Sequence, residues 1–96
     1  MAIDLTYYRS RIDDLDRQIA ALLAKRFAVV DGIAEYKKAN ALPVYNASRE
    51  DAVLQKVAMI AGEEYADDVK KVYEAVFEIS RDRQRCTLSC RTEKRA

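Results

Sequence analysis

Apolar residues in the first part of the chain recur every three or four positions, the spacing of a helix with one buried side. They run, without an internal proline, through Leu5, Tyr8, Ile12, Leu15, Ile19, Leu22, Val29 or Val30, and Ile33. This pattern predicts one long helix over about residues 5–38. Lys37 and Lys38 suit its C-terminus, and Pro43 disfavours helical geometry in the residue before it, so a loop is predicted next.

A second helix is predicted over about residues 47–62. Asn46 or Ser48 can cap its start, and Asp51, three residues after Ser48, makes a weak variant of a capping box. Gly62 closes this helix because glycine adopts the left-handed conformation at low cost.

A third helix is predicted over about residues 67–88. Its apolar positions are Val69, Val72, Tyr73, Val76, Phe77 and Ile79. Residues 89–96 are basic, lack periodicity and are expected to fray. We therefore expect an all-α fold and a single domain over residues 1–96, which agrees with only two glycines and one proline.

The long helix is too long to be covered by its own chain. At about 1.5 Å per residue it spans roughly 50 Å, and the second helix covers less than half of that. Much of its apolar stripe would stay in water in a monomer. Pairing two copies across a two-fold axis buries the same stripe on both chains, so a homodimer joined through its long helices is expected.

Polar residues interrupt the apolar rhythm of all three helices. Arg26 and Lys37 continue the stripe of the first helix, and Arg9 borders it. The second helix has Arg49, with Glu50 beside it, and the third has Ser80 and Gln84. Buried cations without partners are costly, so their positions imply nearby carboxylates or a bound anion. Taken singly, each arginine suits an ordinary ion pair or an extended surface side chain.

Spacing along the first helix shows which of these cations can share one ligand. Arg26 and Lys37 are eleven residues apart, roughly 16 Å, a gap that their side chains and one small dianion can fill. Arg9 lies roughly 25 Å from Arg26, too far to share that ligand within a straight helix. If Arg9 serves such a site, it serves the site of the neighbouring chain.

Composition narrows the classes of function. Seventeen Lys and Arg balance sixteen Asp and Glu, so no overall field favours nucleic acid or an anionic membrane. The start of the chain lacks the pattern of a signal peptide, and no apolar run reaches the length of a membrane span, which predicts a cytoplasmic protein. Cys86 and Cys90 are expected to be reduced, and without histidine no metal site is expected.

The polar residues form an ordered set that resembles the all-helical class of chorismate mutases, from Leu5 to about Leu88. The matching elements are Arg9, Leu15-Asp16, Leu22-Leu23-Ala24-Lys25-Arg26, Lys37, Pro43-Val44, Arg49-Glu50, Ser80 and Gln84. This resemblance implies an intertwined homodimeric helical bundle. It also implies an isomerase that rearranges chorismate to prephenate, without a cofactor, in phenylalanine and tyrosine biosynthesis.

The resemblance also implies which residues bind the two carboxylates of chorismate. Arg9 from the neighbouring chain would join Arg26 and Arg49, with help from Ser80. Each active site would thus be built mostly from one chain and completed by the other. Chorismate and a second copy of the chain are the partners expected, with no nucleic acid and no membrane.

Two further contacts are implied at the reacting part of the substrate. Lys37 and Gln84 would hydrogen-bond the ether oxygen whose bond breaks. Glu50 would accept from the ring hydroxyl, together with the backbone near Asn46, where the family often has Asp. The reaction is concerted and intramolecular and needs no acid, base or metal, so a chain without histidine suits it.

Two other functions remain open on the sequence. An isochorismate pyruvate-lyase would use similar cations on a similar ligand, although Arg49-Glu50 after the loop favours the mutase. A non-catalytic helical dimerisation module would instead pair the stripe cations with Asp or Glu across its interface.

Overall fold

A computed structural model describes residues 4–89 of the chain. It consists of helices α1 (Leu5–Ala39), α2 (Ala47–Ala61) and α3 (Ala66–Ser89). The prediction of an all-α fold with three helices is confirmed, and each predicted bound lies within one residue of the observed one. Ser89 belongs to α3 rather than to a frayed tail. The rest of the predicted tail, which includes Cys90, lies outside the described residues.

Side chains cap both ends of α1. The carboxylate of Asp4 accepts a hydrogen bond from the backbone N–H of Tyr7 at 3.1 Å. At the other end, the side-chain amide of Asn40 donates to the carbonyl oxygen of Tyr36 at 2.8 Å. Helix ends leave backbone groups without partners in the helix, so these contacts fix where α1 begins and ends.

The start of α2 is capped by Asn46 and not by Ser48. The Asn46 side-chain oxygen accepts from the backbone N–H of Arg49 at 3.1 Å, and the Ser48 hydroxyl donates to the same oxygen at 3.0 Å. Of the two candidates that the sequence leaves open, Asn46 is therefore the cap. Gly62 ends α2 with a φ of 90°, as its predicted role requires.

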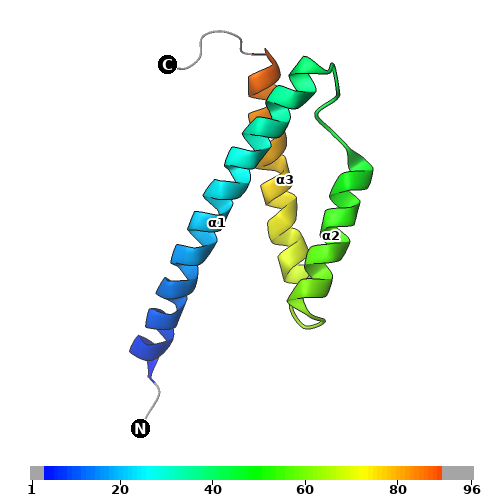
Figure 1. The fold of residues 1–96 in the computed structure, drawn as a ribbon. Coiled ribbons are helices and arrows are strands. Elements are labelled where there is room, and N and C mark those ends of the chain that lie inside the picture. Colours follow the sequence, from blue (N-terminus) through cyan, green and yellow to red (C-terminus); the bar gives the residue numbers. More distant parts are fainter. Residues whose placement is uncertain (1–3, 90–96) are drawn as a thin grey trace.

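Helix α3 packs against both α1 and α2, which lie apart from each other (Figure 1). The buried apolar side chains among the described residues are few: Val30 and Ala34 from α1, and Val76 and Phe77 from α3. They place the core between the C-terminal half of α1 and the middle of α3. A core of this size gives a single chain little stability.

The N-terminal half of α1 extends away from the other two helices (Figure 1). The side chains of its apolar stripe are exposed, from 47% at Leu15 to 61% at Leu22. The expectation that this stripe stays in water in a single chain is confirmed. None of the described helices is long and apolar enough to cross a membrane.

An ion pair fastens α1 to α3 beside the core. The Nε and Nη2 atoms of Arg83 donate to the two carboxylate oxygens of Asp31 at 2.9 and 2.6 Å. These hydrogen bonds are the main reason that the pKa of Asp31 is lowered and that of Arg83 is raised from their ordinary values. Both side chains are more than 40% exposed, so solvent weakens the pair.

Candidate active site

A cavity of about 330 Å³ lies where the C-terminal half of α1, the start of α2 and α3 converge. Its volume falls in the range of roughly 300–1,000 Å³ that is usual for small-molecule sites. Seven of the eight predicted site residues line it: Arg26, Lys37, Asn46, Arg49, Glu50, Ser80 and Gln84. Apolar side chains complete the wall, among them Val30, Ile33, Val53 and Phe77.

Lys37 is fixed at one end of the cavity by two hydrogen bonds. Its Nζ donates to the carbonyl oxygen of Val44 at 2.8 Å and to Oε1 of Gln84 at 2.9 Å. An ammonium has three N–H groups and no acceptor, so one N–H remains for a ligand. The same contact fixes the Gln84 amide, because the atom that accepts from Lys37 must be its oxygen. The Gln84 NH₂ group then stays available as a donor.

Ser80 and Gln84 are the two buried polar residues of the described chain, at 5% and 7% exposure. They lie one helical turn apart on the inner face of α3. The Ser80 hydroxyl has no hydrogen-bond partner among the described residues. A buried polar atom left in this way costs about 1–3 kcal/mol, so its position on the cavity wall suits a ligand that accepts its hydrogen bond.

Arg26 lies over two aromatic rings of α3. Its guanidinium carbon is 5.5 Å from the ring centre of Tyr73 and 5.9 Å from that of Phe77. Such contacts hold a cation over a ring face without neutralising it. Within residues 4–89, neither Arg26 nor Lys37 forms an ion pair, so both keep their charge available to the cavity.

Arg49 and Asn46 enter the cavity from the first turn of α2. The Asn46 side-chain oxygen is already occupied by two hydrogen bonds in the cap described above. The Asn46 side chain therefore fixes the local backbone geometry at the start of α2. The cap also places Arg49, three residues further on, at the start of the helix.

Glu50 has a partner that the sequence analysis missed. Nη1 of Arg81 donates to both carboxylate oxygens of Glu50, at 2.6 and 2.7 Å, and this contact is the main reason that the pKa of Arg81 is raised. Arg81 also lies over the ring of Tyr45. A signal was present, because Arg81 lies four residues after Phe77 and eight after Tyr73 and so continues the apolar face of α3.

Arg9 is not part of this cavity. It lies on the exposed N-terminal half of α1 and does not line the cavity. The separation that the helical rise predicts between Arg9 and Arg26 therefore holds within one chain.

The site is thus a concave pocket on a helical scaffold, with cations, hydrogen-bond donors and an apolar wall suited to a small anionic ligand. The sequence comparisons identify the family. The chain belongs to the chorismate mutase type II family, which it matches over residues 8–85. The resemblance inferred from the spaced residues is confirmed.

Three curated relatives match shorter segments. The T-protein of Haemophilus influenzae is 45% identical over 47 residues, which are 49% of this chain and 12% of that protein. The bifunctional chorismate mutase/prephenate dehydratase of Buchnera aphidicola is 43% identical over 54 residues, 56% of this chain and 14% of the relative. The T-protein of Enterobacter agglomerans is 39% identical over 54 residues, which are 56% of this chain and 14% of that protein.

The chain therefore spans only a small part of the length of the curated relatives that it matches. No solved structure matches.

Proposed function

We propose that this chain is a chorismate mutase that rearranges chorismate to prephenate without a cofactor. One observation carries the proposal: polar residues that interrupt the apolar faces of three separate helices line a single cavity of suitable size. The reaction breaks and forms bonds within one molecule. The protein therefore has to hold a reactive conformer and stabilise the charge that develops on the ether oxygen.

The cations of the cavity suit the two carboxylates of chorismate. Arg26 approaches from α1 and Arg49 from α2, and each guanidinium can hold a carboxylate through two parallel hydrogen bonds. The Ser80 hydroxyl adds a donor that has no other partner among the described residues. Groups from opposite walls would fix both ends of the substrate and so restrict its conformation.

Lys37 and Gln84 are suited to the ether oxygen. Each already has a fixed orientation, because Lys37 donates to Val44 and to the Gln84 oxygen. The remaining N–H of Lys37 and the NH₂ of Gln84 can therefore point at one acceptor without reorganising. Donors held in this way stabilise a transition state by more than mobile water does.

The active form in this proposal is a homodimer. The exposed stripe on the N-terminal half of α1 would pack against a second copy, and each fully buried large apolar side chain stabilises by about 1.5–3 kcal/mol. Arg9 lies in that half of α1 and is far from its own cavity. It would complete the cavity of the second copy as a third carboxylate ligand.

We place this activity in phenylalanine and tyrosine biosynthesis, in the cytoplasm. The name of the Buchnera relative supports the pathway, because it joins chorismate mutase to prephenate dehydratase, which would use the product. We also propose that residues 1–96 form a single domain.

The direct test is to add the purified chain to chorismate and follow the loss of ultraviolet absorbance, with prephenate measured as phenylpyruvate after acid treatment. We expect prephenate to form at an enzymatic rate without added metal or cofactor. Parallel incubation with isochorismate tests for lyase activity, which would release pyruvate. A folded dimer that leaves both substrates unchanged would support a non-catalytic dimerisation module instead.

A further inference from the structure

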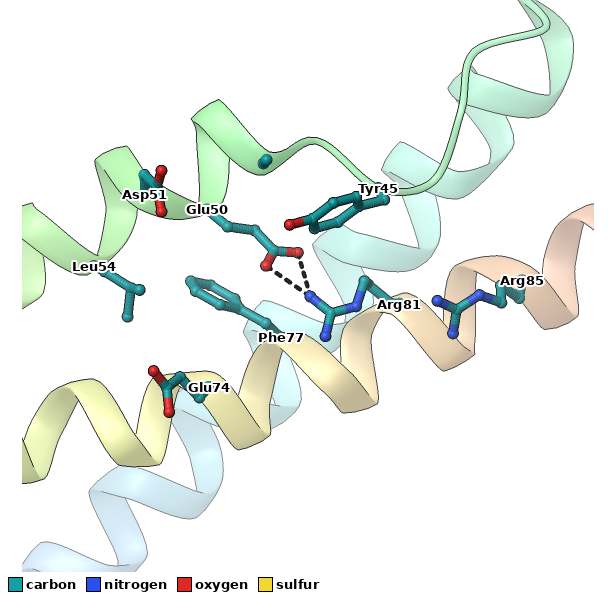
Figure 2. Close-up of a pocket in the computed structure, with 9 residues that line it drawn as sticks. Tyr45, Glu50, Asp51, Leu54, Glu74, Phe77, Arg81 and Arg85 are labelled. Atoms are coloured by element: carbon teal, nitrogen blue, oxygen red, sulfur yellow. Dashed lines mark hydrogen bonds and ion pairs between the residues drawn. The ribbon is translucent and has the colours of Figure 1, made fainter.

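Glu50 and Arg81 lie between two hollows of the chain. Together with Phe77, they line both the candidate active site and a second hollow of about 470 Å³ beside it. Figure 2 shows this second hollow, with Glu50 reaching down from α2 and Arg81 reaching up from α3. The ion pair therefore forms part of the wall of the active-site cavity.

The pair is well placed to fix the orientation of the Glu50 carboxylate. One nitrogen of Arg81 donates to both carboxylate oxygens, and both side chains are three-quarters or more buried. The guanidinium carbon of Arg81 lies 5.4 Å from the ring centre of Tyr45, and this ring limits the movement of the guanidinium. A partly buried, charge-assisted contact of this kind holds a side chain more firmly than an exposed ion pair does.

The ion pair between Glu50 and Arg81 also joins two helices, α2 and α3. Helices α1 and α2 do not pack against each other, so α3 connects the α2 side of the cavity to the rest of it. Arg81 directly follows Ser80 on α3, and Glu50 directly follows Arg49 on α2. The pair is therefore one of the contacts that join the first turn of α2 to α3 beside the cavity.

We propose that Arg81 is a positioning residue that aims the Glu50 carboxylate at the ring hydroxyl of chorismate. The inference rests on the proposed mutase function and adds a residue to it. A carboxylate has about four lone-pair sites, so Glu50 can accept from Arg81 and still accept from a hydroxyl. Arg81 acts through Glu50 in this account and does not itself contact the substrate.

A double-mutant cycle tests this coupling. We expect Arg81→Met to lower kcat/KM for chorismate by about 10- to 100-fold, because small displacements of positioning groups have effects of this size. In a Glu50→Ala background, the same Arg81→Met change should alter kcat/KM by less than about twofold. Residues that act through one another show such non-additivity, whereas independent residues do not.

Two further variants separate positioning from simple structural support. Arg81→Lys should retain most of the activity, because only one nitrogen of Arg81 contacts Glu50. Arg83→Met is the matched control: it removes another ion pair between helices, two residues further along α3, but Arg83 lines neither hollow. We expect it to lower stability slightly and to leave kcat/KM within about twofold, as for exposed pairs.

A substrate analogue without the ring hydroxyl provides the second readout. The native enzyme and Arg81→Met should process this analogue at similar rates, since Glu50 then has no hydroxyl to accept from. Three results would each overturn this inference but not the proposed function. They are additive losses in the cycle, equal losses on both substrates, and an Arg81→Lys variant as poor as Arg81→Met. A native chain that is inactive on chorismate would overturn the proposed function and this inference together.

Discussion

The two halves of α1 have the same apolar rhythm but different surroundings. In the C-terminal half, Val30 and Ala34 are buried against α3, and Arg26 and Lys37 face the cavity. In the N-terminal half, the stripe from Leu5 to Leu22 is exposed. The same spacing therefore creates a core in one half and an uncovered surface in the other.

This difference shows how far a periodic pattern can be interpreted. The pattern defines which face of a helix is apolar, but the partner that covers this face depends on how the chain folds. In the C-terminal half the partner is α3. In the N-terminal half our account assigns it to a second copy of the chain, and Arg9 on that half gains a role only if the second copy is present.

The largest expected effect concerns the C-terminal half. Lys37→Ala should lower kcat by on the order of hundreds-fold, because one preorganised donor at developing charge contributes about 3–4 kcal/mol. Steady-state kinetics on chorismate measure this loss. Lys38→Ala is the matched control, since Lys38 is exposed and does not line the cavity. Near-normal turnover in Lys37→Ala would refute the role of this residue.

The next effect concerns the N-terminal half. Ile19→Asp should weaken the dimer by about 3 kcal/mol or more, because both copies lose a buried apolar side chain and place a charge in the interface. Sedimentation and thermal unfolding over a range of protein concentrations measure this change. Gln18→Asp adds the same charge one residue away, outside the stripe, and should leave the assembly intact. Unchanged assembly in Ile19→Asp would mean that the stripe is not the dimer interface.

A smaller effect is expected within the core of the C-terminal half. Ala34 is fully buried between α1 and α3, so Ala34→Leu should lower the free energy of unfolding by about 1–3 kcal/mol through overpacking. Denaturant unfolding measures this loss. Ala52→Leu adds the same side chain at an exposed position of α2 and should have little effect. Equal stability of the two variants would show that α1 and α3 are not closely packed around Ala34.

The smallest expected effect concerns the ion pair between Asp31 and Arg83. Asp31→Asn should reduce stability at neutral pH by about 0.2–1 kcal/mol, the usual range for a pair as exposed as this one. Because the pKa of Asp31 is lowered in the folded chain, its contribution is complete above its unfolded-state pKa and is lost as the pH falls through the folded-state pKa. Unfolding measured at neutral and strongly acidic pH should show this difference disappearing. A difference independent of pH would contradict the ion-pair explanation.

Local patterns were enough to predict the helices. Every signal that positioned them acts within a few residues: the three-four spacing, the Asn46 cap and the left-handed Gly62. The choice between Asn46 and Ser48 was left open, since both side chains can cap. The structure resolves it because the Ser48 hydroxyl donates to Asn46 instead of accepting from the backbone.

Long-range contacts were predicted only where a chemical requirement linked them. Arg26, Lys37, Ser80 and Gln84 break apolar faces, and this conflict predicted a shared site; the structure places all four on the wall of one cavity. Arg81 also lies on an apolar face, four residues after Phe77, but its partner Glu50 is 31 positions away in sequence. Opposite charges occur along the whole chain, so the sequence did not indicate that these two residues would meet.

The claim that each site combines the C-terminal half of one α1 with the N-terminal half of another is tested most directly by complementation. Arg9→Ala and Lys37→Ala chains, each inactive alone, are mixed, and the heterodimer is isolated by two different affinity tags. One of its two sites would have an intact cavity and an intact Arg9, so we predict that mutase activity returns. A verified heterodimer without activity would contradict the shared site.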